Sequence, residues 1–92
     1  MTYEIVETQS LFEYTDCNAG EFSRVVADIA QNDSGLFAIE FVHEVGEVGS
    51  ETYDILEECY PSKCGLASRE DVMRFLAAWV TENMPDNADR NL

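Results

Sequence analysis

Residues 36–45 have the sequence LFAIEFVHEV. Successive side chains of a β-strand point to opposite faces of a sheet, so alternating residues share a face. Phe37, Ile39, Phe41 and Val45 would share one face, and Ala38, Glu40, Val42 and Glu44 would share the other. The stretch therefore predicts a half-buried strand with an apolar face toward a core and an acidic face toward water.

A second strand is expected to follow this one in a hairpin. Residues 46–50 contain two glycines and have the length of a hairpin loop, and residues 52–60 return as the next strand. Its expected core side carries Tyr53, Ile55 and Cys59, and its outward side carries Asp54, Leu56 and Glu58. Pro61 ends this strand, because proline cannot donate a ladder hydrogen bond.

Two segments show the periodicity of an amphipathic helix. The first begins at Asn18, which with Glu21 forms a capping box, and its apolar stripe is Phe22, Val25, Val26 and Ile29. The second begins at the cap Ser68, and its stripe is Val72, Phe75, Leu76, Trp79 and Val80. We expect residues 32–35 to end the first helix and Asn83 with Pro85 to end the second.

The N-terminal residues complete the predicted fold. Residues 3–7 mix aromatic, β-branched and acidic residues, which indicates a strand, and residues 11–15 form either a second strand or its continuation through a bulge. The order β(β)αββα predicts an α+β, two-layer sandwich, in which a small, mainly antiparallel sheet carries two amphipathic helices on one face. Residues 1–84 would form a single domain and residues 85–92 a polar C-terminal tail.

The charge of the chain is concentrated in its first two thirds. Residues 1–62 hold fourteen acidic residues and one basic residue, Arg24, and residues 63–92 hold five acids and four bases. The formal charge of −14 therefore divides into −13 and −1. Such a surface repels nucleic acid and anionic membranes and attracts strongly basic partners.

The hairpin is expected to gather many of these carboxylates on its outward side and rim. Residues on one face of a strand are about 7 Å apart, and neighbouring strands are about 4.8 Å apart, so the acids would form a dense lattice. The predicted partner-binding residues are Glu40, Glu44, Glu47, Glu51, Asp54, Glu57 and Glu58, with Glu4 extending the patch from the first strand. The apolar residues Val42, Val48 and Leu56 on the wet side support an alternative, a non-enzymatic adaptor or subunit of a host complex.

A short acidic α+β chain with these carboxylates resembles the small inhibitors made by bacteriophages, among them anti-CRISPR proteins and the DNA mimics that block restriction enzymes. The resemblance rests on architecture, chain length and charge. It implies a viral protein that evades host defence by docking on a Lys/Arg-rich surface of a Cas effector or another nucleic-acid-binding complex, and so blocks DNA binding. Plain acidic solubility and adaptation to high salt are the alternatives for the same composition.

Signals for chemistry are weak beside the charge. Cys59 and Cys64 have a C-x4-C spacing and could bind zinc together with Cys17 and His43, form a disulfide, or remain reduced. With one histidine and no nucleophile motif or phosphate-binding glycine loop, no enzyme activity and no cofactor are expected. The N-terminus lacks the features of a signal peptide, which predicts a cytoplasmic protein, in the bacterial host if a phage encodes it.

Overall fold

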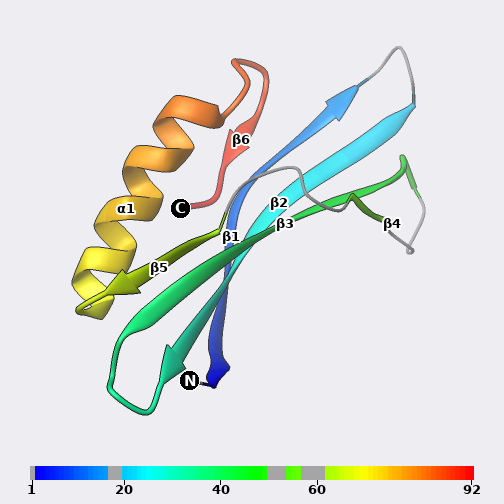
Figure 1. The fold of residues 1–92 in the computed structure, drawn as a ribbon. Coiled ribbons are helices and arrows are strands. Elements are labelled where there is room, and N and C mark those ends of the chain that lie inside the picture. Colours follow the sequence, from blue (N-terminus) through cyan, green and yellow to red (C-terminus); the bar gives the residue numbers. More distant parts are fainter. Residues whose placement is uncertain (1, 17–19, 50–53, 57–61) are drawn as a thin grey trace.

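The computed structural model describes residues 2–16, 20–49, 54–56 and 62–92, and in them the chain forms a mainly antiparallel sheet and one helix (Figure 1). The elements in chain order are β1 (Tyr3–Asp16), β2 (Glu21–Asn32), β3 (Phe37–Glu47), β4 (Asp54–Leu56), β5 (Lys63–Leu66), α1 (Arg69–Asn83) and β6 (Asp89–Arg90). The strand order is β4-β3-β2-β1-β6, and β5 also pairs with β3. The predicted two-helix sandwich is therefore wrong, because the described residues contain one helix and a larger sheet than expected.

The error lies in the segment that follows Gly20. Residues expected to form the first helix are β2, which pairs with β1 on one side and β3 on the other. Val25 and Ile29 of the predicted helical stripe are four residues apart, a spacing that also fits a strand. Four of the six buried residues of β2, Ser23, Val25, Ala27 and Ile29, follow period two. β-branched residues favour strands. Because β2 lies between two partner strands, its backbone N–H and C=O groups can form hydrogen bonds on both sides.

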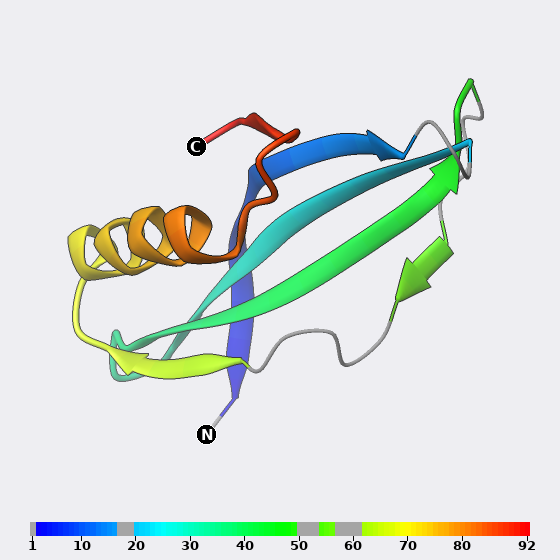
Figure 2. The same ribbon diagram turned by 90° about the horizontal axis from the view of Figure 1, so that it is seen from above.

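β1 is one long strand that continues through irregularities, which confirms the second of the two possibilities for residues 3–15. Its register with β2 shifts between Ile5 and Glu7 and again between Ser10 and Phe12. Such bulges bend a strand and increase its twist. Figure 2 shows the strong bend of β1 as it crosses the end of the helix. The bend lets Leu11 and Phe12 both reach the core, where they are 0% and 1% exposed.

The turn between β2 and β3 occurs where the sequence predicted an end to regular structure. The Asn32 side-chain oxygen accepts hydrogen bonds from the backbone N–H groups of Ser34 and Leu36, each at 3.0 Å. Gly35 has φ +84°, a conformation that glycine adopts without steric cost. The stop signal was correctly placed, and it closes a hairpin instead of capping a helix.

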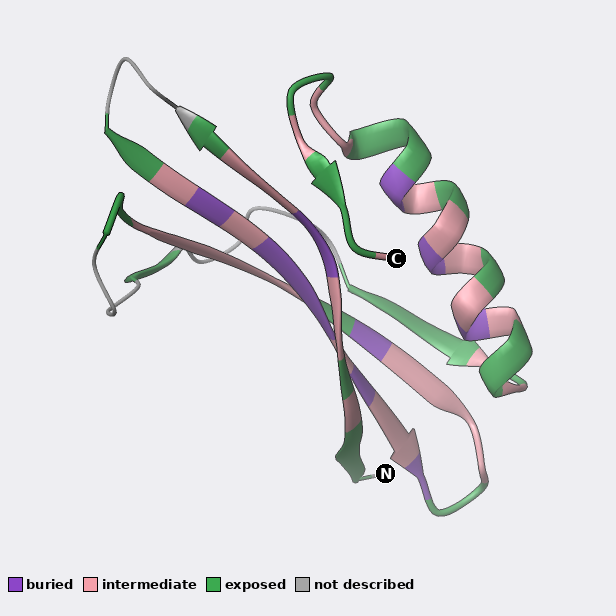
Figure 3. Cartoon of the chain, turned by 180° about the vertical axis from the view of Figure 1, so that it is seen from behind, coloured by how far each residue is buried: buried purple, intermediate pink, exposed green. Residues whose placement is uncertain are grey.

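Helix α1 confirms the second predicted helix and forms the other layer of the core. The Ser68 hydroxyl accepts from the Asp71 N–H at 3.1 Å, which caps the helix as expected. Val72, Leu76 and Val80 are fully buried against Val25, Ala27, Ile29 and Ile39 of the sheet, as the purple bands of Figure 3 show. Trp79 stacks on Phe41 with ring centroids 4.1 Å apart.

The helix connects the two sides of the sheet. β5 precedes it and pairs with β3, while β6 follows it and pairs with β1, so α1 crosses one face from one side to the other (Figure 1). The segment expected to be a polar tail thus includes an edge strand, with Arg90 opposite Phe12 and Leu92 packed against the core. The strand at Lys63–Leu66 was not predicted from the sequence, and much of the expected strand at 52–60 lies outside the described residues.

Candidate functional site

The sheet has a face that α1 does not cover, and we call it the helix-free face. Since directly opposed residues of an antiparallel ladder share a face, the register defines it. Its central residues are Arg24, Val26, Asp28 and Ala30 on β2, opposite Glu44, Val42, Glu40 and Ala38 on β3. The prediction that Ala38, Glu40, Val42 and Glu44 share the face away from the core is confirmed.

Of the predicted carboxylate lattice, two described residues, Glu40 and Glu44, lie on this face. Asp54 is exposed, but it pairs with Val45, whereas Ile55, expected in the core, pairs with Glu44 and is 63% exposed. The alternation predicted for residues 52–60 is therefore inverted in β4.

Glu4 and Glu47, two further predicted residues that the structure describes, do not join Glu40 and Glu44. Glu4 pairs with Gln31, whose partner on β3 is the core-packed Phe37, so its register position belongs to the helix-covered face. Glu47 ends β3 opposite Glu21, at the far end of the sheet. Glu51, Glu57 and Glu58 lie outside the described residues.

One row of the helix-free face contains a basic residue between two acids. Arg24 lies between Glu13 of β1 and Glu44 of β3. Its guanidinium forms a salt bridge with Glu44, in which Nε donates to Oε2 at 2.9 Å and NH2 donates to the same oxygen. The side chains of Arg24 and Glu44 are 37% and 21% exposed, so this pair is less screened by water than an ordinary surface pair.

Two other rows oppose like charges. Asp28 of β2 is directly opposite Glu40 of β3 on the helix-free face, and Glu21 is opposite Glu47 near the end of the same ladder. Opposed residues have Cβ atoms about 5 Å apart, and like charges at this separation destabilise a sheet. Asp28 accepts a hydrogen bond from the Thr8 hydroxyl at 2.9 Å, which orients its carboxylate without neutralising it.

Each of the five basic side chains has a partner within the molecule. Arg24 binds Glu44, Arg69 binds Glu7, and Arg74 binds Glu70 and Asp71. Arg90 donates to the carbonyl oxygens of Ala77 and Leu92 and to the Thr81 hydroxyl, and the Lys63 Nζ lies 5.7 Å from the centroid of the Phe75 ring. Hydrogen bonding and charge from Arg69 lower the pKa of Glu7 and keep that carboxylate ionised.

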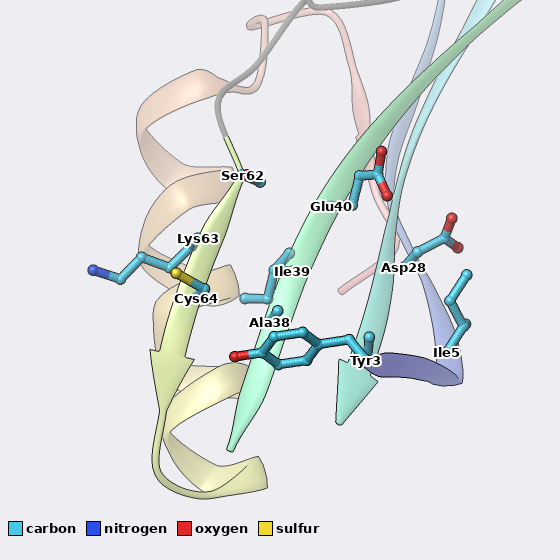
Figure 4. Close-up of a pocket in the computed structure, with 10 residues that line it drawn as sticks. Tyr3, Ile5, Asp28, Ala38, Ile39, Glu40, Ser62, Lys63 and Cys64 are labelled. Carbon is cyan, nitrogen blue, oxygen red and sulfur yellow. The ribbon is translucent and has the colours of Figure 1, made fainter. Parts of the chain in front are cut away.

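A groove with a volume of about 460 Å³ lies beside Asp28 and Glu40 (Figure 4). The small residues Ala30 and Ala38 line it along β2 and β3, and Tyr3 and Ile5 line it from β1. Residues 62–64, at the start of β5, form the opposite wall. The volume falls within the range of about 300–1,000 Å³ that is typical of small-ligand pockets.

The charged groups that face this groove are acidic. Figure 4 shows the carboxylates of Asp28 and Glu40 at one end of the groove and the Tyr3 ring extended along its length toward Cys64. Lys63 contributes to the wall, but its ammonium group points away from both carboxylates, which agrees with its position near Phe75. The groove therefore combines small and apolar surfaces, an aromatic ring and two acids.

The candidate zinc residues do not form a set in the described structure. His43 lies opposite Val25 in the core-facing register, beside the Tyr14 ring, and burial lowers its pKa. Cys64 is exposed and follows Lys63, which pairs with Ile39, roughly 13 Å along β3 from His43. Cys17 and Cys59 lie outside the described residues, and within the described part no group of three or more His, Cys, Asp or Glu side chains could hold a metal ion.

The contribution of β2 to this face was not predicted from the sequence. Arg24 and Asp28 were expected on the wet side of a helix, where they would not have met Glu40 and Glu44. The signal that could have located them is the even spacing of Arg24 and Asp28, which places both on the face opposite Val25 and Ala27 if the segment is a strand. The placement of Tyr3 on this face depends on the bulged register of β1, which the sequence did not specify.

Comparison with known protein families, with curated proteins and with solved structures finds no match to this chain. Among the residues that the structure describes, no helix combines the length and apolarity required to cross a membrane.

Proposed function

We propose that this protein is a non-enzymatic binding protein that occupies a Lys/Arg-rich, nucleic-acid-binding surface of another protein or ribonucleoprotein complex and so blocks DNA binding. A phage inhibitor of a CRISPR effector is the most specific form of this proposal. The observation that carries it is the distribution of charge. All five cations are engaged within the molecule, and the chain keeps a net charge of −14 that would attract a cationic partner.

The like-charged rows support this proposal. A sheet that needed acids only for solubility could intersperse lysines among them, because opposed like charges destabilise the strand pair. Here Asp28 opposes Glu40 and Glu21 opposes Glu47 on the two central strands. A cationic surface would relieve this repulsion on binding, and complementary charge would accelerate association.

The test is capture of a partner followed by competition with nucleic acid. The protein is immobilised, exposed to bacterial lysate at about 50 mM and about 0.5 M salt, and then washed with double-stranded DNA. We expect a basic nucleic-acid-binding protein that is retained at low salt, released at high salt and displaced by DNA. Retention at high salt, or indifference to DNA, would contradict the proposal.

A matched pair of variants separates the helix-free face from total charge. Asp28→Lys with Glu40→Lys and, as the control, Glu82→Lys with Asp86→Lys each change the formal charge from −14 to −10, since each reversal adds two charges. We expect the first variant to lose the partner and the control to retain it. Equal loss in both would show that overall charge, and not this face, determines binding.

Exposed apolar side chains favour one second candidate, an adaptor. Ile5, Val6, Val48 and Ile55 are 62%, 56%, 61% and 63% exposed, and Val48 was among the residues predicted for this function. Val42 is half-buried on the helix-free face. An adaptor that binds through such residues would hold its partner at high salt and would not release it to DNA, so the same capture experiment distinguishes the two functions.

A further inference from the structure

The groove beside Asp28 and Glu40 combines features that suit one long cationic side chain. Its two carboxylates lie at one end on adjoining strands, and Ala30 and Ala38 provide a surface along which a hydrocarbon stem could lie. Tyr3, 37% exposed, supplies an aromatic ring beside the same space. A carboxylate pair attracts a cation, and hydrogen bonds between charged groups are stronger than those between neutral groups.

We propose that this groove binds an arginine side chain from an exposed segment of the partner protein. The inference rests on the proposed function and gives it a specific anchor. Arginine is favoured over lysine because its planar guanidinium can donate to both carboxylates at once. The cavity of about 460 Å³ is large enough for one such side chain and the adjoining backbone.

A second copy of this chain is a poor source for that arginine. Arg24, Arg69, Arg74 and Arg90 each donate hydrogen bonds to groups of their own molecule. Two molecules with a charge of −14 also repel each other. The neighbouring Lys63 directs its ammonium group toward Phe75, so it does not occupy the place of the incoming guanidinium.

The test uses the isotopically labelled full chain and a short acetylated and amidated Gly-Ser-Arg-Ser-Gly peptide, followed by NMR titration. We expect the backbone signals of Ala30, Ala38 and Glu40 to shift in a saturable manner. The matched peptide that carries citrulline in place of arginine keeps the shape and removes the charge, and it should produce no such shifts. Equal responses to both peptides, or shifts spread over all acidic residues, would overturn the inference.

Variants of the protein separate charge from shape. Glu40→Gln should weaken peptide binding about tenfold, the loss expected when a charged hydrogen-bond partner is removed. Glu47→Gln makes the same change of charge outside the groove and should weaken binding less than about twofold. Ala38→Leu fills the groove without altering charge and should also weaken binding. Equal effects of Glu40→Gln and Glu47→Gln would overturn the inference, as would unchanged binding by Ala38→Leu.

Folding of each variant is checked from signals outside the groove. Asp28→Asn is a secondary variant, because Asp28 also accepts the Thr8 hydrogen bond and its replacement alters that contact. Peptide binding in the groove without DNA-sensitive capture of a partner would support the arginine site and contradict the proposed function. DNA-sensitive capture that survives both Glu40→Gln and Ala38→Leu would support the function and remove the arginine site.

Discussion

The two faces of the β1–β2–β3 sheet are built from alternating residues of the same strands, yet they have opposite physical tasks. On one face, Val25, Ile29 and Ile39 are fully buried beneath α1. On the other, Asp28 and Glu40 oppose each other and Arg24 binds Glu44. Because the stabilising apolar contacts are concentrated on the helix-covered face, the helix-free face can carry a destabilising charge arrangement and still belong to a folded protein.

The largest expected effect comes from a matched pair of isoleucines. Ile29→Ala removes a fully buried side chain from the helix-covered face and should lower the free energy of unfolding by about 2–5 kcal/mol. Ile55→Ala removes a side chain that is 63% exposed and should change it by no more than about 0.5 kcal/mol. Urea denaturation followed by circular dichroism measures both. Similar losses of unfolding free energy would mean that the two faces contribute equally to stability.

A smaller effect is expected from the Arg24–Glu44 salt bridge of the helix-free face. Arg24→Gln leaves the half-buried Glu44 carboxylate without its salt bridge and should cost about 0.5–1 kcal/mol of unfolding free energy. The loss should shrink in high salt, because ions screen the attraction that the variant lacks. Arg74→Gln is the control, since the Arg74 side chain is 70% exposed and its i,i+3 and i,i+4 pairs contribute little. Equal losses in the two variants would contradict this distinction.

The smallest expected effect is the pH dependence of the free energy of unfolding that His43 contributes from the helix-covered face. Burial lowers the pKa of His43, so folding favours the neutral imidazole. The unfolded chain then binds the proton more readily, and the stability present above the ordinary histidine pKa of 6.5 is lost as the pH falls through it. Urea midpoints at pH 7.5 and 5.5 should therefore fall on acidification for the natural chain, and the fall should be smaller for His43→Gln. An identical fall of the urea midpoint in the natural chain and in His43→Gln would show that groups other than His43 cause the pH dependence.

The alternation of residues 36–45 was predictable because strand geometry alone determines which side chains share a face. The helix after Ser68 was predictable because its cap and a five-residue stripe agree, and a strand does not produce that stripe. The strand β2 was not predictable, because the spacing of Val25 and Ile29 fits both a helix and a strand. Whether the segment forms a helix or a strand depends on whether β1 and β3 are present to pair with it. Tertiary pairing decided between two locally acceptable structures.

The candidate site depends even more on strand pairing that the local sequence does not determine. Glu40 and Glu44 were placed correctly because they belong to the strand with the clearest alternation. Asp28 and Arg24 were assigned to a separate helix, so the row opposite them could not be foreseen. The groove depends further on the bulge near Ile5 and on β5, and neither has a distinctive local signal in the sequence. Charge identified the kind of surface, whereas the register determined which charges meet.

The contact between the side chains of Asn91 and Ser10, 2.9 Å long, joins residues 81 positions apart. Bringing such distant segments together has an entropic cost that the neighbouring β1–β2 and β2–β3 hairpins do not incur to the same degree. During synthesis, β1 leaves the ribosome long before the strand that pairs with it at Phe12 and Glu13. The helix that covers the apolar side of the sheet also follows these strands in the chain, so a nascent chain that lacks it would expose Val25, Ile29 and Ile39 to chaperones.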